Sequence, residues 1–133
     1  MLLAFLITLL FSTPRPAAAP THAFSVRIPS YWSTPCSQPA AERAELMRAA
    51  EKEKYAVARV EFIGNEHIRD WVLRRRVLLN EGDLFRKSRL LRSLDNLNRL
   101  RTIKPVRLAQ VVIRLDKGNK SVNISICFRE RHP

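Results

Sequence analysis

Two cysteines and three histidines are the residues of this sequence whose side chains could most readily bind a metal or act as a nucleophile. Cys36 and Cys127 lie far apart in the chain, and no histidine stands at metal-ligand spacing from either of them. His67 lacks the second histidine of a zinc-binding HExxH helix, and the sequence contains no glycine-rich phosphate loop or GxSxG nucleophile elbow. Glu81 and Asp83 flank a glycine, but an ordinary loop explains them better than a pair of catalytic carboxylates. We therefore expect no metal, no cofactor and no enzymatic activity.

The length and charge of the chain narrow its function further. Its 133 residues suit one ordinary domain, and 46% of them are hydrophobic, which argues against a disordered polycation. Lys and Arg number 24 against 12 Asp and Glu, so the formal net charge is +12. A charge of this sign is compatible with nucleic acid, anionic lipid or an acidic partner, and does not choose among them.

The N-terminal segment resembles an export signal. Residues 2–11, LLAFLITLLF, form an apolar run that is too short for a transmembrane helix but suits a signal peptide, with cleavage after Ala23. No Lys or Arg precedes the run, so a wrongly chosen start codon or an N-terminal core helix is the alternative. We expect residues 1–23 to be a signal peptide and the protein to be exported.

Residues 24–54 are expected to be a linker. Three prolines (Pro29, Pro35 and Pro39) disfavour regular structure in its first half. Its second half, AAERAELMRAAEKEK, is rich in helix formers but poor in large apolar side chains, which predicts a solvated helix or a mobile segment. In an oxidising compartment Cys36 could pair with Cys127, although free or intermolecular thiols are about as compatible with its place in a linker.

Residues 55–133 carry the pattern of a compact β-α-α-β-β unit. A strand around Val60 ends at a turn, and apolar spacings then predict one helix over residues 68–79 and another around Leu90, Leu94 and Leu97. Two strands follow, over residues 106–115 and 122–128, joined by a hairpin turn. This order predicts an α+β domain with two helices packed on one face of a three-stranded sheet. Its turns contain all three glycines: Gly64, Gly82 and Gly118.

The same residues resemble a POTRA domain, the periplasmic module that precedes outer-membrane barrels of the BamA type. The similar stretches are VEFIGN, LRRRVLLNEGD, the leucines of the second helix, LRTIKPV and ISICFRER, and they span nearly all of residues 55–131. The resemblance implies a mixed sheet, a periplasmic location, no enzymatic activity and a role in outer-membrane protein assembly. Arg86 and Arg101 depart from the small polar residue and the glycine that the family often has there. The sequence shows one copy of the unit, and we expect it to act without a barrel of its own.

The resemblance also implies a mode of binding. An edge strand presents unpaired N–H and C=O groups to which an extended segment of an envelope or outer-membrane protein can add itself as a further strand. The expected edge carries arginines that would attract acidic sequences, or would simply prevent aggregation. It comprises Val106, Arg107, Leu108, Ala109, Gln110, Val111, Val112, Ile113 and Arg114.

A basic patch on the helices is the second candidate surface. It could bind anionic lipid, lipopolysaccharide or another polyanion, or could be an ordinary solvated helix face. Nucleic acid is the less favoured partner, because the sequence lacks an RNA-binding aromatic pair on a strand and any zinc or helix-turn-helix signature. The patch comprises Arg74, Arg75, Arg76, Arg86, Lys87, Arg89, Arg92, Arg99 and Arg101.

Overall fold

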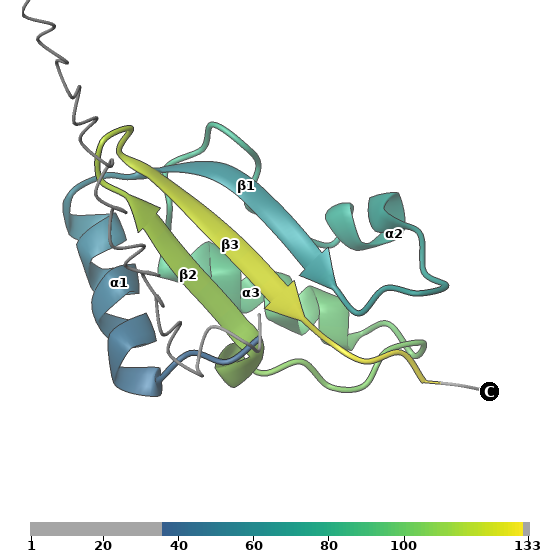
Figure 1. The fold of residues 1–133 in the computed structure, drawn as a ribbon. Coiled ribbons are helices and arrows are strands. Elements are labelled where there is room, and N and C mark those ends of the chain that lie inside the picture. The colour runs from purple at the N-terminus through teal and green to yellow at the C-terminus, as the bar shows by residue number, and fades with distance from the viewer. Residues whose placement is uncertain (1–35, 132–133) are drawn as a thin grey trace, which may run out of the picture.

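A computed structural model describes residues 36–131 of the chain (Figure 1). The expected signal peptide and the proline-rich part of the expected linker up to residue 35 lie outside these residues. The described elements, in chain order, are α1 (Ala40–Lys52), β1 (Ala56–Ile63), α2 (Asp70–Arg74), α3 (Lys87–Asn98), a 3₁₀ turn (Leu108–Gln110), β2 (Val111–Asp116) and β3 (Ser121–Cys127).

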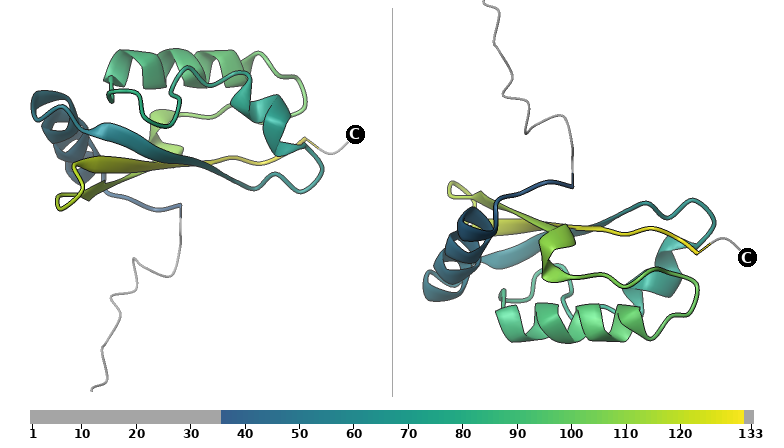
Figure 2. Two further views of the ribbon diagram at one scale, coloured as in Figure 1. Left: turned by 90° about the horizontal axis from the view of Figure 1, so that it is seen from above. Right: turned by 90° about the horizontal axis from the view of Figure 1, so that it is seen from below.

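The three strands form one mixed sheet in the order β1-β3-β2. The last strand, β3, is therefore central: it pairs in parallel with β1, Val60 opposite Ile124, and antiparallel with β2, Ile113 opposite Ile124. α2 and α3 lie on one face of the sheet (Figure 2). The expected α+β class, with two helices on one face of a mixed sheet, is confirmed.

The core lies between this sheet face and the helices. Val122, Ile124 and Ile126 of β3 are fully buried, and Leu90 and Leu97 of α3 pack into the same cluster. Each such side chain stabilises the fold by about 1.5–3 kcal/mol relative to leaving it exposed. The alternation along β3 and the leucine spacing of α3 thus mark the two surfaces that meet.

α1 is a helix, as its composition predicts, and one of its faces is buried while the other is exposed. Met47 and Ala50 are buried in the core cluster, and Arg43 is only 5% exposed. These three residues recur at helical spacing, so they share one face. That face packs beside β2, and the expectation of a solvated helix or mobile segment is wrong for residues 40–52.

The first helix of the expected pair is much shorter than its apolar spacing suggests. α2 ends at Arg74, and residues 77–80 are neither helix nor strand. Val77 and Leu79 are buried on either side of the exposed Leu78, so this stretch alternates as an extended segment does. The apolar residues that extended the predicted helix therefore reach the core by a different backbone geometry.

The strand expected over residues 106–115 begins later, at Val111. Val106 is buried before it, and the Asn98 side chain holds the Val106 backbone by donating to its carbonyl (2.9 Å) and accepting from its N–H (2.7 Å). The 3₁₀ turn over Leu108–Gln110 then redirects the chain into β2. The first five residues of the expected edge are thus outside the sheet.

The turn after β1 requires a glycine. Gly64 has φ +103°, in the left-handed region, and a Cβ at this position would collide with the carbonyl oxygen of Phe128. Gly82 also has a positive φ, +91°, but faces open space. In the hairpin between β2 and β3, Asp116 accepts from the N–H groups of Gly118 (3.0 Å) and Asn119 (3.2 Å).

Within residues 36–131, no helix combines the length and apolarity needed to cross a lipid bilayer.

Candidate functional site

The outer edge of β2 is the part of the expected binding strand that lies in the sheet. Val112 and Arg114 pair with β3 across hydrogen-bonded positions, so the backbone groups of Val111, Ile113 and Leu115 point away from it. In an open edge these groups would be free for an added strand. Here most of them already have partners.

The segment that covers this edge is residues 36–43, which we call the strap. The side-chain amide of Gln38 donates to the Ile113 carbonyl and accepts from the Ile113 N–H, both at 2.9 Å. Arg43 donates from Nε to the Val111 carbonyl (2.7 Å) and from Nη2 to the carbonyls of Gln38 (2.6 Å) and Ala109 (3.1 Å). The strap therefore occupies the β2 edge at Val111 and Ile113, and an extended partner cannot pair with these two residues while the strap is in place.

A disulfide between Cys36 and Cys127 fixes the start of the strap, with the two Cα atoms 5.8 Å apart. Cys127 ends β3 and is 6% exposed, on the sheet face opposite the core residues Ile124 and Ile126. The strap thus runs from this face, around the edge of β2, into α1. The sequence suggested the cysteine pair but gave no sign that it anchors a cover over the expected site.

The outer edge of β1 is covered over its first half. Val57 donates its N–H to the Asp83 carbonyl and accepts from the Gly82 N–H, both at 2.7 Å, and Phe85 donates to the Tyr55 carbonyl. In the second half, the Val60 carbonyl accepts a longer bond (3.3 Å) from Arg74 Nη2. The β1–β3 register turns the Phe62 N–H and C=O outward as well, and among residues 36–131 no backbone or side-chain group pairs with them there.

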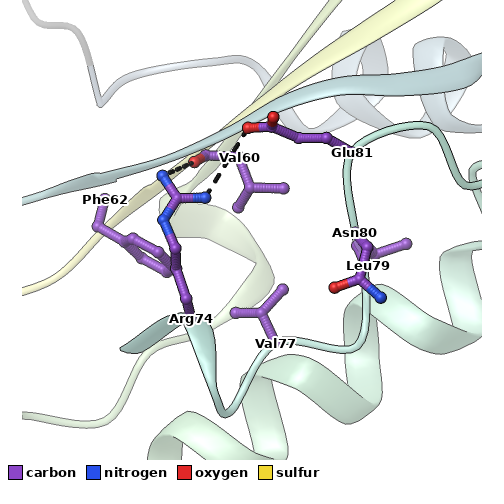
Figure 3. A pocket seen from close by; sticks show the side chains of 7 residues that line it. All are labelled: Val60, Phe62, Arg74, Val77, Leu79, Asn80 and Glu81. Atoms are coloured by element: carbon purple, nitrogen blue, oxygen red, sulfur yellow. Dashed lines mark hydrogen bonds and ion pairs between the residues drawn. The ribbon is translucent and has the colours of Figure 1, made fainter. Parts of the chain in front are cut away.

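A hollow of about 340 Å³ adjoins this uncovered stretch (Figure 3). Figure 3 shows the Phe62 ring and the Arg74 guanidinium at one side of it and Glu81 above, with dashed lines from Arg74 to the Val60 carbonyl and to Glu81. Arg74 lies 5.8 Å from the Phe62 ring centroid and 3.9 Å from Glu81. The residues that line the hollow are Val60, Phe62, Arg74, Val77, Leu79, Asn80 and Glu81. Sequence reasoning placed these residues in separate elements and did not bring them together.

The nine residues of the basic patch are all exposed. Asn96 of α3 donates to the Arg76 carbonyl (3.2 Å), which places the three consecutive arginines beside the basic helix. Arg75 stacks on the Trp71 ring at 5.0 Å, while Arg89 pairs with Asp83 (3.3 Å). Arg75 and Arg76 thus lie near α3 beside the exposed Trp71 ring, whereas Arg74 points to the Val60 carbonyl; that the nine residues act as one binding patch stays a prediction.

One carboxylate holds the loop after β1. Glu130 accepts from the backbone N–H groups of Ile68 (2.8 Å) and His67 (2.9 Å), and from His67 Nδ1 (3.0 Å). The bonds from Ile68 and His67 lower the pKa of Glu130 against a smaller opposing effect of desolvation. The group has a structural role, and residues 36–131 contain no cluster of three or more metal-binding side chains.

Residues 55–131 match the family model described as "POTRA: Surface antigen variable number repeat". The chain belongs to the POTRA family. α1 and the strap precede the matched residues, so the cover of the β2 edge lies outside the part of the chain that defines the POTRA unit. A search of curated proteins finds no match.

Solved structures agree on the POTRA fold. BamA from Haemophilus ducreyi lacking POTRA domains 1–3 is similar with a TM-score of 0.51 and 24% identity over 58% of this chain. The N-terminal domain of Omp85 from Thermosynechococcus elongatus gives a TM-score of 0.50 and 18% identity over 59% of this chain. The matches cover 14% and 36% of those two chains, so this chain corresponds to only part of each.

Proposed function

We propose that this POTRA protein is an exported, non-enzymatic docking module of the bacterial envelope, located in the periplasm. It would bind extended segments of envelope or outer-membrane proteins by adding them to its sheet as a further strand, in support of outer-membrane protein assembly. Membership of the POTRA family and the fold shared with BamA and Omp85 structures support this role.

The observation that supports the binding mode is the pair of outward Phe62 backbone groups on the β1 edge, which have no partner within residues 36–131 and lie beside the hollow. An extended backbone there could pair with the outward N–H and C=O of Phe62. A side chain of the guest could enter the hollow and contact the half-buried Phe62 ring. Arg74 and Glu81 would interact with polar groups of the guest. This site replaces the β2 edge that the sequence suggested, because the strap closes that edge in the structure.

A pair of proline substitutions tests the site. Phe62→Pro removes the outward N–H on β1, and Leu115→Pro removes the corresponding outward N–H on β2. Both residues are half-buried and pack against the same core, so the two variants carry comparable damage to the fold. Circular dichroism establishes that each variant is folded before binding is measured.

Binding is measured as capture of the disulfide-bonded protein on immobilised peptides of about ten residues, tiled across the strands of an outer-membrane barrel protein. We expect Phe62→Pro to weaken capture at least about tenfold and Leu115→Pro to leave it within about twofold of the wild type. No capture by the wild-type protein, or equal capture by a folded Phe62→Pro variant, would refute the β1 site.

A second candidate function is docking on an anionic bilayer, and the exposed apolar side chains of the helical layer favour it. Trp71 is 53% exposed under Arg75, and Leu91 is 39% exposed between basic residues of α3. Each Lys or Arg near an acidic bilayer contributes about 1 kcal/mol. We expect Arg75→Glu/Arg76→Glu to abolish sedimentation with vesicles containing about 30% phosphatidylglycerol, and Lys117→Glu/Lys120→Glu in the hairpin to preserve it. Equal loss in both variants would show attraction by net charge alone and contradict a docking face.

A further inference from the structure

We propose that the strap is a releasable cover over a second strand-binding edge, on β2, and that the Cys36–Cys127 disulfide holds this cover in place. The proposal rests on the strand-addition function above and adds its regulation. Cutting the disulfide would make the edge accessible to an extended segment of another polypeptide.

The way in which Gln38 binds β2 identifies the chemistry that the edge accepts. One amide group donates to the carbonyl and accepts from the N–H of the same residue, Ile113, as a residue of a neighbouring strand would do. The Arg43 guanidinium similarly donates a hydrogen bond to the Val111 carbonyl. With the Gln38 amide displaced, the outward groups of Ile113 and Leu115 would pair with a guest backbone, while the Val111 carbonyl keeps its bond from Arg43. The exposed Arg114 would favour a guest with an acidic residue beside it.

The strap is held at its two ends by different means. At the α1 end, the buried Arg43, Met47 and Ala50 fix it to the body of the protein. At the other end, the disulfide is the covalent anchor, and Gln38 lies between the two. With the bridge cut, Gln38 would be held at the edge by the two hydrogen bonds of its side-chain amide, by the bond that its backbone carbonyl accepts from Arg43 and by the connection to α1, which are weak constraints against a longer guest strand.

The disulfide is also placed where a reductant could reach it. A hollow of about 320 Å³ is lined by Cys36, Gly64, Gln110, Cys127 and Arg129, together with Ile63 and Phe128. Cys36 is partly exposed whereas Cys127 is buried, so attack on the Cys36 sulfur is the more accessible route. A dithiol would form a mixed disulfide with Cys36 and release the Cys127 thiolate, and its second thiol would then release Cys36. Two electrons and two protons pass to the protein cysteines, and the dithiol becomes a disulfide.

Amide hydrogen exchange tests the release directly, since neighbouring residues of β2 report on different partners. The Ile113 N–H is protected by Gln38 of the strap, whereas the Arg114 N–H faces β3. On reduction with dithiothreitol we expect exchange at Ile113 to accelerate at least about tenfold and exchange at Arg114 to change by less than about twofold. Gln38→Ala with the disulfide intact should accelerate Ile113 in the same way. Unchanged exchange at Ile113 after complete reduction would overturn the proposal.

Peptide capture then tests the uncovered edge, with the β1 site disabled by Phe62→Pro. We expect reduction to raise the capture of this variant on the tiled peptides at least about tenfold, with bound peptide restoring the protection of Ile113. Adding Leu115→Pro should remove the gain. A reduced Phe62→Pro protein that captures no peptide would refute the second edge. This outcome differs from failure of the proposed function, in which the disulfide-bonded wild-type protein captures nothing or Phe62→Pro leaves its capture unchanged.

Discussion

Replacing Arg43 by methionine should strongly destabilise the protein, because it removes three hydrogen bonds that the strap makes. The guanidinium is 5% exposed and donates to three carbonyls, those of Val111, Gln38 and Ala109, at 2.6–3.1 Å. Hydrogen bonds from a charged group contribute about 1.5–3 kcal/mol each, but desolvation of the guanidinium offsets much of their sum. Methionine retains most of the apolar packing of the stem against α1 and β2.

We therefore expect Arg43→Met to lower the free energy of unfolding by about 3 kcal/mol, which corresponds to a fall in Tm of roughly 12–24 °C for a domain of this size. Urea unfolding of the disulfide-bonded protein, followed by circular dichroism, measures the change. Arg43→Lys keeps the charge but lacks the planar fork and should lose about half as much.

Arg48→Met is the matched control, because Arg48 is exposed on the same helix and the change should cost less than about 0.5 kcal/mol. If Arg43→Met stays within about 1 kcal/mol of the wild type, the bonds from Arg43 to Val111, Ala109 and Gln38 do not hold the strap in place.

Three further predictions concern the body of the domain. Gly64→Ala should lower the free energy of unfolding in urea by more than about 3 kcal/mol, because the added Cβ collides with the Phe128 carbonyl oxygen. Gly82→Ala, which has a similar φ but faces open space, should lower it by about 1 kcal/mol. Equal losses in the two variants would contradict the role of the contact with Phe128. The lowered pKa of Glu130 gives stability that is present above the ordinary glutamate pKa of 4.5 and is lost as the pH falls through the lower folded value. The Tm difference between the wild type and Glu130→Gln should therefore shrink in thermal scans below about pH 4, and a pH-independent difference would exclude this linkage. Leu97→Ala in the core should cost about 2–5 kcal/mol by the same urea assay and Leu91→Ala on the exposed side of α3 much less; comparable losses would disprove the assigned helix face.

Sequence patterns predict those helices and strands whose apolar residues recur at the period of the element and all lie on its buried face. Leu90, Leu94 and Leu97 define α3 because each apolar side chain occupies a core position. The alternation of apolar and polar residues along β3 predicts this strand equally well, because successive side chains point to opposite faces and one of these faces packs on the core. In both elements the buried residues are apolar, so their spacing can be read from the sequence.

The packing of the strap and of α1 against β2 was not predicted, because a buried arginine occupies one of the positions that an apolar residue would mark. Arg43, Met47 and Ala50 lie at helical spacing, but an arginine at the first position hides the buried face. Gln38 gives no signal at all, since a side-chain amide that imitates a strand looks like any surface glutamine. The candidate site on β1 was missed for a different reason: its hollow joins Phe62 to Glu81 through a turn whose path no local pattern specifies.

The central position of β3 determines when the sheet can form. In the sheet, β1 and β2 each pair with β3, which follows them both in the chain. Neither strand can therefore pair in the sheet until residues 121–127 are available. Ala56 cannot pair before Ser121 has been synthesised, and the disulfide cannot form before Cys127 has been synthesised. A chain emerging from a ribosome therefore remains without this sheet until residues 121–127 have appeared. Under the export proposed above, this delay would leave residues 56–127 without their sheet while they cross the membrane.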